Sequence, residues 1–312
     1  MKTWLVTGGC GFIGSHLADA LVARGDRVRI IDDLSTGDRR NAPRQAEVVV
    51  ADVARQDRLV EAMAGVDGCF HLAAVASVER ANGDWVGTHR TNLTGAIAVF
   101  DAARRASSAR PLPVVYASSA AVYGACTDVP LSESAPTRPV SAYGADKIGC
   151  EMHAGAGWIV HRVPSVGLRF FNVYGPRQDP SSPYSGVIAV FSDRLARRQP
   201  ILIHGDGQQS RDFIFVDDVV RFLLAAMERS AAGAQVFNVC TGHGTTIVEL
   251  AATMSALAGA PLEFVHASPR AGDVRASIGD PLAAETVLGL RATVGLRAGL
   301  AHLLKEPTVA EK

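Results

Sequence analysis

Short apolar runs alternate with amphipathic stretches over the first 120 residues. The runs are rich in β-branched and aromatic residues and lie at 4–8, 27–32, 46–52, 68–74 and 113–119. Runs of this length that are apolar throughout are typical of parallel strands covered on both faces, and the stretches between them have helical spacing. The pattern therefore predicts repeated βαβ units, and so an α/β fold with a doubly wound parallel sheet.

The alternation loosens beyond residue 165. Residues 166–175 and 212–220 still have the pattern of a strand and a strand-to-helix junction, but proline and glycine become frequent at 175–186 and 204–209. Because open α/β sheets bind ligands at the carboxyl ends of their strands, we expect a smaller, interleaved α/β substrate-binding lobe to cover that edge. The expected division is a sheet domain over 1–168 plus about 212–242, and a lobe over about 169–211 and 243–312.

Composition narrows the classes of partner. Lysine plus arginine equals aspartate plus glutamate at 31 each, so no overall field favours nucleic acid or an anionic membrane. The chain opens on a strand pattern rather than a leader, and no run reaches the roughly 18 apolar residues of a membrane helix. We expect a cytoplasmic enzyme. The five cysteines are scattered without a CxxC pair, which predicts reduced thiols and no metal site.

A glycine-rich turn joins the first strand to the first helix. Gly8, Gly11 and Gly14 stand at intervals of three, and Asp32 ends the second strand. Glycine lets a ligand approach the backbone, a helix N-terminus favours a pyrophosphate, and a carboxylate can bind a ribose diol. We therefore predict a dinucleotide site in which a Cβ would block the pyrophosphate. Asp32 would repel a 2′-phosphate, which favours NAD over NADP; an ordinary structural turn is the alternative.

The GxxGxxG spacing resembles that of the short-chain dehydrogenase/reductase superfamily, whose fold is Rossmann-like. The resemblance implies adenine contacts after the third strand and a segment under the cofactor after the fourth. His71 in that segment is interpreted as a packed core histidine. The predicted NAD-binding residues are Gly8, Gly11, Phe12, Ile13, Gly14, Asp32, Asp33, Asp52, Val53, Leu72, Ala73, Ala74, Asn92, Ser118, Tyr143 and Lys147.

A tyrosine and a lysine follow at the spacing of one helical turn. Tyr143 and Lys147 would share a helix face, and Ser118 and Ser119 end the fifth strand. A phenol with a pKa of about 10 is a poor base at neutral pH, but a nearby ammonium and the nicotinamide's positive charge favour the phenolate. Such a pair can take a proton from an alcohol while a hydride leaves its carbon. We expect Tyr143, Lys147 and Ser119 to be catalytic.

The resemblance extends over nearly the whole chain and points to the extended branch of the superfamily, the NAD-dependent nucleotide-sugar epimerases and dehydratases. Dehydratases of this branch carry an Asp-Glu pair after the serine, and related decarboxylases carry a glutamate there. This chain has Ala120 and Ala121, so it lacks the general acid that expels a hydroxide. Oxidation at C4 followed by return of the hydride to the other face remains, which is epimerisation through a transient 4-keto sugar.

The second half of the chain resembles UDP-hexose 4-epimerases at 170–188, 205–220 and 269–277. The resemblance implies phosphate, ribose and sugar contacts, and the arginine fork suits a diphosphate. A small residue at 277, where a bulky tyrosine often stands, would leave room for a 2-acetamido group, so we expect UDP-glucose/UDP-galactose and also UDP-GlcNAc/UDP-GalNAc as substrates. The predicted substrate-binding residues are Ser119, Tyr143, Asn172, Arg177, Arg211, Arg270, Asp273 and Ser277.

Three other functions stay open from the residues alone. A UDP-glucuronate 4-epimerase would need an additional cation, a nucleotide-sugar 4-reductase or dehydrogenase would perform net redox, and a non-catalytic NAD-sensing regulator would typically lack the tyrosine or the lysine. The resemblance also implies a homodimer formed through the Tyr143 helix and the helix around 85–105. Asp146, just before Lys147, departs from the family pattern, and we expect it to point elsewhere around the helix.

Overall fold

The computed structural model describes residues 1–107, 110–126, 128–179, 186–230, 233–270 and 272–305. Its large sheet is parallel throughout and has the order β10-β6-β5-β4-β1-β2-β3. The order reverses between β1 and β4, which places a ligand crevice at the carboxyl ends of these strands. This confirms the predicted Rossmann-like sheet. The strands are β1 (Thr3–Thr7), β2 (Arg27–Asp32), β3 (Glu47–Val50), β4 (Gly68–His71), β5 (Val114–Ser119), β6 (Ser165–Phe170) and β10 (Ala234–Val239).

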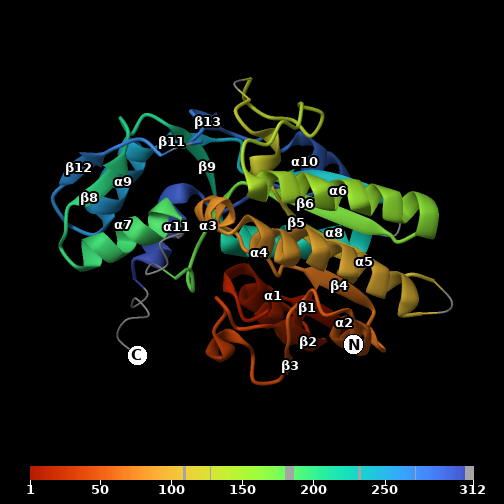
Figure 1. Cartoon of the computed structure of the whole chain (residues 1–312). Coiled ribbons are helices and arrows are strands. Elements are labelled where there is room, and N and C mark those ends of the chain that lie inside the picture. The colour runs from red at the N-terminus through yellow and green to blue at the C-terminus, as the bar shows by residue number, and fades with distance from the viewer. Residues whose placement is uncertain (108–109, 127, 180–185, 231–232, 271, 306–312) are drawn as a thin grey trace.

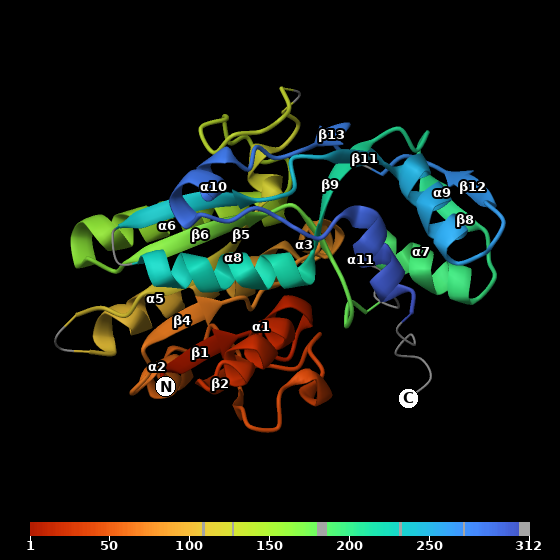
Figure 2. The ribbon, with the colours of Figure 1, turned by 180° about the vertical axis from the view of Figure 1, so that it is seen from behind.

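Helices cover both faces of the sheet. On β1, Trp4 and Val6 pack into one core and Leu5 packs into the other, because successive side chains point to opposite faces. Both faces are buried, which explains why the strands are apolar throughout. One face is covered by α1 (Phe12–Ala23), α8 (Val216–Arg229) and α10 (Leu282–Leu288), and the other by α2 (Gln56–Met63), α5 (Gly95–Arg105) and α6 (Ala142–His161), as Figures 1 and 2 show from opposite sides.

Short helical segments connect β4 to α5 and follow β2 and β5. A π-helical turn, η2, leads directly into α5; such turns are frequent at functional sites. The segments are η1 (Arg39–Asn41), α3 (Val78–Gly83), α4 (Trp85–His89), η2 (Arg90–Thr94) and η3 (Ala120–Tyr123).

A smaller part of the molecule lies beside the carboxyl ends of the large sheet (Figure 1). The chain enters this part directly from the large sheet, since a single residue, Phe171, separates β6 from β7. The strands of this part are β7 (Asn172–Tyr174), β9 (Ser210–Phe215), β11 (Gly244–Thr246) and β13 (Ala276–Ser277), grouped around β9, and the pair β8 (Ile201–His204) and β12 (Phe264–Ala267). Its helices are α7 (Val187–Ala196), α9 (Ile247–Leu257) and α11 (Leu296–Leu303).

The chain passes between the two parts several times. β9 runs straight into α8 on the large sheet, β10 returns to that sheet, and α10 packs there although it follows β13. The predicted residue boundaries of the two domains stay a prediction. Within the described ranges, no helix combines the length and the apolar character that a membrane span requires.

Candidate active site

The three glycines of the first turn meet different surroundings. Gly8 has a left-handed φ of 70°, and a Cβ there would lie 2.7 Å from the amide nitrogen of Ala73. A Cβ on Gly14 would overlap the carbonyl oxygen of Gly8. The protein's own backbone therefore requires these two glycines, which corrects the expectation that a ligand excludes a side chain at all three. At Gly11 the nearest atom to a Cβ would be the Gly8 oxygen at 3.2 Å, and the remaining space is open to a ligand.

The first turn of α1 can accept an anion. The N-cap residue is Gly11, which has no side chain that could accept from the free N–H groups of the first turn. No other side chain of the described residues caps them either. The first turn carries no acidic residue, so the helix dipole is not neutralised. Phe12 and Ile13 are half-buried at this end. The open space beside Gly11 and these donors fit the pyrophosphate of a dinucleotide.

Asp32 is fixed beneath this turn. Its carboxylate is buried and accepts hydrogen bonds from the backbone N–H groups of Cys10 and Leu34, each at 2.9 Å. Burial raises the pKa of the Asp32 carboxyl, and these two hydrogen bonds act in the opposite direction. Each oxygen has a further lone pair for a ribose hydroxyl. Asp33 is exposed and accepts from Ser35 instead.

The segment after β4 is held against the glycine turn. The Thr7 hydroxyl accepts from the N–H groups of Leu72 and Ala73 at 3.2 and 3.1 Å. Two residues after Ala73, the N–H of Val75 donates to the side-chain oxygen of Asn92 at 2.8 Å. The side-chain NH₂ of Asn92 in turn donates to the carbonyl oxygen of Val75 at 3.1 Å. The Asn92 side chain thus orders the backbone of this segment, and a contact of its own with NAD stays a prediction.

The residues after β3 border an open hollow of about 470 Å³. Asp52 lines it, accepts from the N–H of Ala54 at 2.8 Å and forms an ion pair with Arg90 at 3.0 Å. Val53 is buried, and its side chain packs where η2 meets α5 at Gly95. Val53 therefore offers a ligand its backbone rather than its side chain.

The predicted catalytic pair lies at the start of α6. The helix begins there because the Ser141 hydroxyl caps it by accepting from the N–H of Gly144 at 3.1 Å. The Lys147 ammonium lies 5.7 Å from the centre of the Tyr143 ring and donates to the carbonyl oxygen of Ala117 at 2.8 Å. Lys147 is only 3% exposed, so its charge acts in a medium of low polarity.

Ser119 lies on the turn against which this helix packs. Its hydroxyl accepts from the N–H of Ala121 at 3.1 Å and starts η3. A Cβ on Gly144 would lie 2.6 Å from the carbonyl oxygen of Ala121, so a glycine is needed next to Tyr143 for α6 to reach this turn. Sequence reasoning missed Gly144; a glycine inside a predicted helix, where alanine is favoured, was the available signal.

Two neighbours of the pair have side chains that turn away from it. Ser118 is buried, and its hydroxyl donates to Glu151 at 2.5 Å rather than facing the crevice. Asp146 is buried and contacts His89 of α4 at 2.8 Å, so it points away from the Tyr143 face as expected.

His71 is a core residue. It is buried, and its Nδ1 lies 2.8 Å from the hydroxyl oxygen of Thr7. Burial, with a smaller effect of the Lys147 charge, lowers the pKa of His71 from 6.5 to about 3. The structure supports the interpretation of His71 as a packed histidine.

This histidine predicts a pH dependence of stability. The folded protein keeps His71 neutral down to pH 3, whereas the unfolded chain binds a proton below about 6.5. Its contribution is therefore complete above pH 6.5 and is lost on acidification towards pH 3, at roughly 1.4 kcal/mol per pH unit. Urea unfolding from about pH 7 to about pH 5 should show a smaller decline for His71→Gln than for the wild type. Equal slopes would contradict this assignment.

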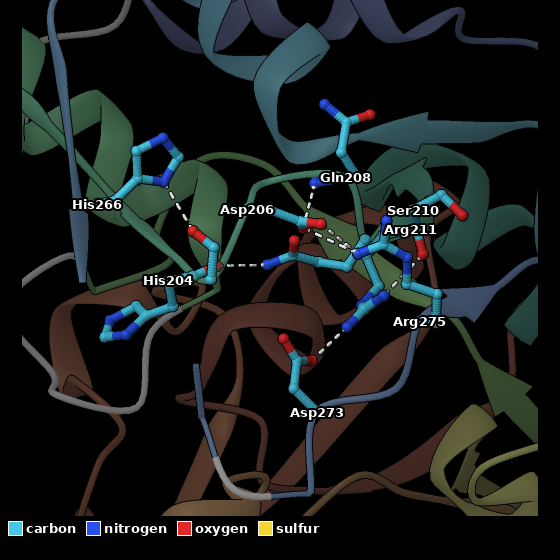
Figure 3. Close-up of polar contacts among 10 residues, drawn as sticks. His204, Asp206, Gln208, Ser210, Arg211, His266, Asp273 and Arg275 are labelled. Carbon is cyan, nitrogen blue, oxygen red and sulfur yellow. Dashed lines mark hydrogen bonds and ion pairs between the residues drawn. The ribbon is translucent and has the colours of Figure 1, made fainter. Parts of the chain in front are cut away.

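Three of the predicted substrate residues lie on strands of the small sheet. Arg211 lies on β9, Ser277 is its register partner on β13, and Asn172 on β7 pairs with Phe213 of β9. The Arg211 guanidinium forms an ion pair with Asp273 (Figure 3). Burial lowers the pKa of Arg211 and the Asp273 carboxylate acts in the opposite direction, but an arginine remains charged at any physiological pH.

Two predicted arginines have other surroundings. Arg177 forms an ion pair with Asp19 of α1 at 2.7 Å, and Arg270 is exposed on the loop before Asp273. The backbone carbonyl of Arg270 accepts from the N–H of Asp273 at 3.3 Å, but among the described residues neither arginine side chain makes a hydrogen bond or ion pair with Arg211 or Asp273. Residues 180–185 of the predicted substrate loop lie outside the described residues.

Comparison with known proteins gives a consistent result. A UDP-glucose 4-epimerase of Mycolicibacterium smegmatis is 39% identical over 98% of each chain. The solved UDP-glucose 4-epimerase of Thermotoga maritima with UDP-glucose superposes with a TM-score of 0.92, at 35% identity over 97% of each chain. A UDP-N-acetylglucosamine 4-epimerase of Methanobrevibacter ruminantium, in complex with UDP-N-acetylmuramic acid, has a TM-score of 0.91, at 32% identity over 97% of each chain.

The match extends to the family as a whole. The model of the NAD dependent epimerase/dehydratase family covers residues 4–240, which include the glycine turn, Ser119, and the Tyr143–Lys147 pair. The strand order, the open helix N-terminus and the tyrosine–lysine helix described above all lie within this range. The chain belongs to the NAD-dependent epimerase/dehydratase family.

Proposed function

We propose that this protein is an NAD-dependent UDP-hexose 4-epimerase, which interconverts gluco- and galacto-configured UDP-sugars. The observation that carries the proposal is the packing of the Tyr143–Lys147 helix, through Gly144, against a turn that holds Ser119. The two residues after Ser119 are Ala120 and Ala121. The site therefore has a base for oxidation of an alcohol, which is Tyr143, but no acid at these two positions to protonate a leaving hydroxide in a dehydration. The names of the relatives support epimerisation over the alternatives.

NAD would lie across the carboxyl ends of β1 and β4, with its pyrophosphate at Gly11 and a ribose at Asp32, and it supplies a reversible hydride acceptor. Tyr143 takes the proton of the sugar's C4 hydroxyl as the hydride departs, and Ser119 donates a hydrogen bond to the same oxygen. Lys147, fixed on the Ala117 carbonyl, stabilises the phenolate. After the 4-keto sugar has rotated, the hydride would return to the other face of C4 while Tyr143 returns the proton to the oxygen, so the C4 configuration is inverted.

The small sheet would hold the nucleotide. Arg211 offers a fork of donors to the diphosphate, and Asp273 and Asn172 lie close to it through the ion pair and the strand register. Figure 3 shows the Arg211 guanidinium paired with the Asp273 carboxylate, and the substrate diphosphate would replace that carboxylate as the anionic partner of Arg211. Arg270 and Arg177 would complete the contacts only after their side chains move.

The test is incubation of the purified protein, without added NADH, with UDP-glucose and separately with UDP-GlcNAc. Proton NMR resolves the C4 epimers, and conversion of either sugar is the expected result. A stoichiometric change in NADH absorbance would instead indicate the net-redox alternative. No conversion, even with added NAD, would reject the proposal, and UDP-glucuronate would then be the next substrate to test.

Ser277 predicts which sugars are accepted. Its side chain is small and lies beside Arg211 on β13, so a tyrosine there would occupy space that the serine does not. Ser277→Tyr should lower kcat/KM for UDP-GlcNAc by about tenfold or more while changing that for UDP-glucose only a few-fold. Ser277→Ala is the matched control and should retain both activities. Parallel losses for both sugars in Ser277→Tyr would show that residue 277 does not select the acetamido group.

We also propose that two copies associate through α4, α5 and α6. Exposed apolar side chains gather on these helices, and a groove of about 220 Å³ runs between α5 and α6. The exposed residues are Trp85, Val86, Ile97, Met152, Ile159 and Val160. Light scattering should give a dimer that Ile159→Glu dissociates; a wild-type monomer would reject the proposed dimer.

We also propose a cytoplasmic location, which the five free thiols suit.

A further inference from the structure

A third residue shares the helix face of Tyr143 and Lys147. Glu151 lies one turn beyond Lys147 on α6, as Lys147 lies one turn beyond Tyr143. Lys147 donates to the Ala117 carbonyl, and Glu151 accepts from the hydroxyl of the next residue, Ser118. The helix is thus attached at two successive positions of β5, directly before Ser119.

Glu151 would be expected to pair with Lys147. Oppositely charged residues four apart on a helix attract each other, and burial strengthens the attraction because the surroundings screen it poorly. Yet in the described part of the chain Lys147 has no carboxylate within ion-pair distance. An uncompensated pull from Glu151 would draw the ammonium away from the tyrosine ring.

The Glu151 carboxylate forms its ion pair with Arg169 of β6 instead. The Nε of Arg169 donates to Oε1 at 2.9 Å and its Nη2 donates to Oε2 at 2.7 Å, with both side chains under a tenth exposed. Arg169 is itself fixed, because Nη1 donates to the Tyr123 hydroxyl at 2.9 Å and to the Glu133 carbonyl at 3.1 Å. This two-point ion pair neutralises Glu151 and holds it in place.

We propose that Arg169 is a positioning residue that holds Glu151 away from Lys147, and so keeps the Lys147 charge available to Tyr143. The inference rests on the proposed function, since it assigns Tyr143 the role of base. Arg169 touches neither reacting group and acts through Glu151.

The other titratable groups near Lys147 leave Glu151 as the decisive one. His71 of β4 is neutral, with a pKa of about 3, and burial raises the pKa values of Cys150 on α6 and Tyr116 on β5, so both stay protonated. The neighbouring carboxylate, Asp146, faces His89 of α4. Among the described residues, Glu151 is therefore the carboxylate that a single substitution would release towards Lys147.

Three variants of the full-length holoenzyme test this: Arg169→Met, Glu151→Gln and the double variant. In Arg169→Met the released carboxylate disfavours the phenolate, so the acid limb of the kcat profile should move to higher pH by about one unit. Activity at neutral pH should fall roughly tenfold. In Glu151→Gln the uncompensated arginine favours the phenolate, so the limb should move to lower pH. In the double variant the limb should return to the wild-type position.

A purely structural role predicts another pattern. It would lower the yield or stability of both single variants without moving the limb, and that result, or a double variant that keeps the shift, overturns the proposal. Arg221→Met is the matched control, because it leaves the buried Asp218 without its arginine on the opposite face of the sheet. If Arg169→Met fails to fold, a limb in Glu151→Gln below the wild-type position supports the proposal, and a limb at or above that position overturns it.

One readout is independent of turnover. Ultraviolet difference absorbance, with Tyr143→Phe subtracted, follows the ionisation of Tyr143 in the holoenzyme. If the wild type epimerises neither sugar, the proposed function fails. A phenolate titration that still moves to higher pH in Arg169→Met and returns in the double variant would support the Arg169 role by itself, and an unmoved titration would overturn it.

Discussion

Replacing Tyr143 with phenylalanine is expected to lower kcat for epimerisation about a thousandfold. The substitution removes the oxygen that we propose takes and returns the C4 proton, and keeps the ring beside which Lys147 lies. Neither the Gly144 approach to Ala121 nor the Lys147 bond to the Ala117 carbonyl involves that oxygen. Folding and NAD content should therefore be unchanged. The measurement is kcat by NMR, with NAD released by denaturation and quantified.

Tyr174→Phe serves as the matched control for this loss. Tyr174 is buried in the core of the small sheet, where its hydroxyl donates to the carbonyl of Leu296 at 3.3 Å. The variant should lose about 1 kcal/mol of stability and little activity. A Tyr143→Phe enzyme that retained more than about a tenth of wild-type kcat would show that another group moves the proton.

The sheet could be predicted because its strands are buried on both faces. Leu5 faces one core and Trp4 and Val6 face the other, so β1 has no polar side and its apolar run stands out from the amphipathic helices around it. The smaller part gave a weaker signal. β7 and β13 contain three and two residues, too few for a period to be read, and their partners on β9 are distant in sequence.

The proximity of Tyr143 and Lys147 was predictable because the two residues are local neighbours with a fixed helical spacing. Contacts between distant segments were not. The buried pair of Glu151 and Arg169 joins a helix to a strand, and neither residue has a spacing that marks it. Arg177 was expected near the substrate because of its neighbours in sequence, and its ion pair with Asp19 depends on how α1 packs.

Gly14→Ala is expected to have the second large effect: a loss of about 3 kcal/mol of folding stability, together with the loss of bound NAD. The new Cβ would overlap the Gly8 carbonyl oxygen and lie 2.9 Å from the Gly9 Cα. Both are backbone atoms at the point where α1 meets β1, so neither can move without displacing the turn. Thermal unfolding and NAD content are the measurements. Gly155→Ala, in a helix with open space around the residue, should instead gain roughly 0.5–1 kcal/mol.

Gly11→Ala separates the two reasons for glycine in this turn. Its φ of −81° suits alanine and its Cβ would meet only the Gly8 oxygen at 3.2 Å, so stability should change by less than about 1 kcal/mol. The open space beside it is where we expect the pyrophosphate, so NAD affinity should fall about tenfold or more. If Gly11→Ala keeps its NAD while Gly14→Ala loses both NAD and stability, the spacing of three records how α1 packs on the strand. The glycine spacing would then predict the packing of the fold, and it would predict dinucleotide binding only indirectly, because this fold binds dinucleotides.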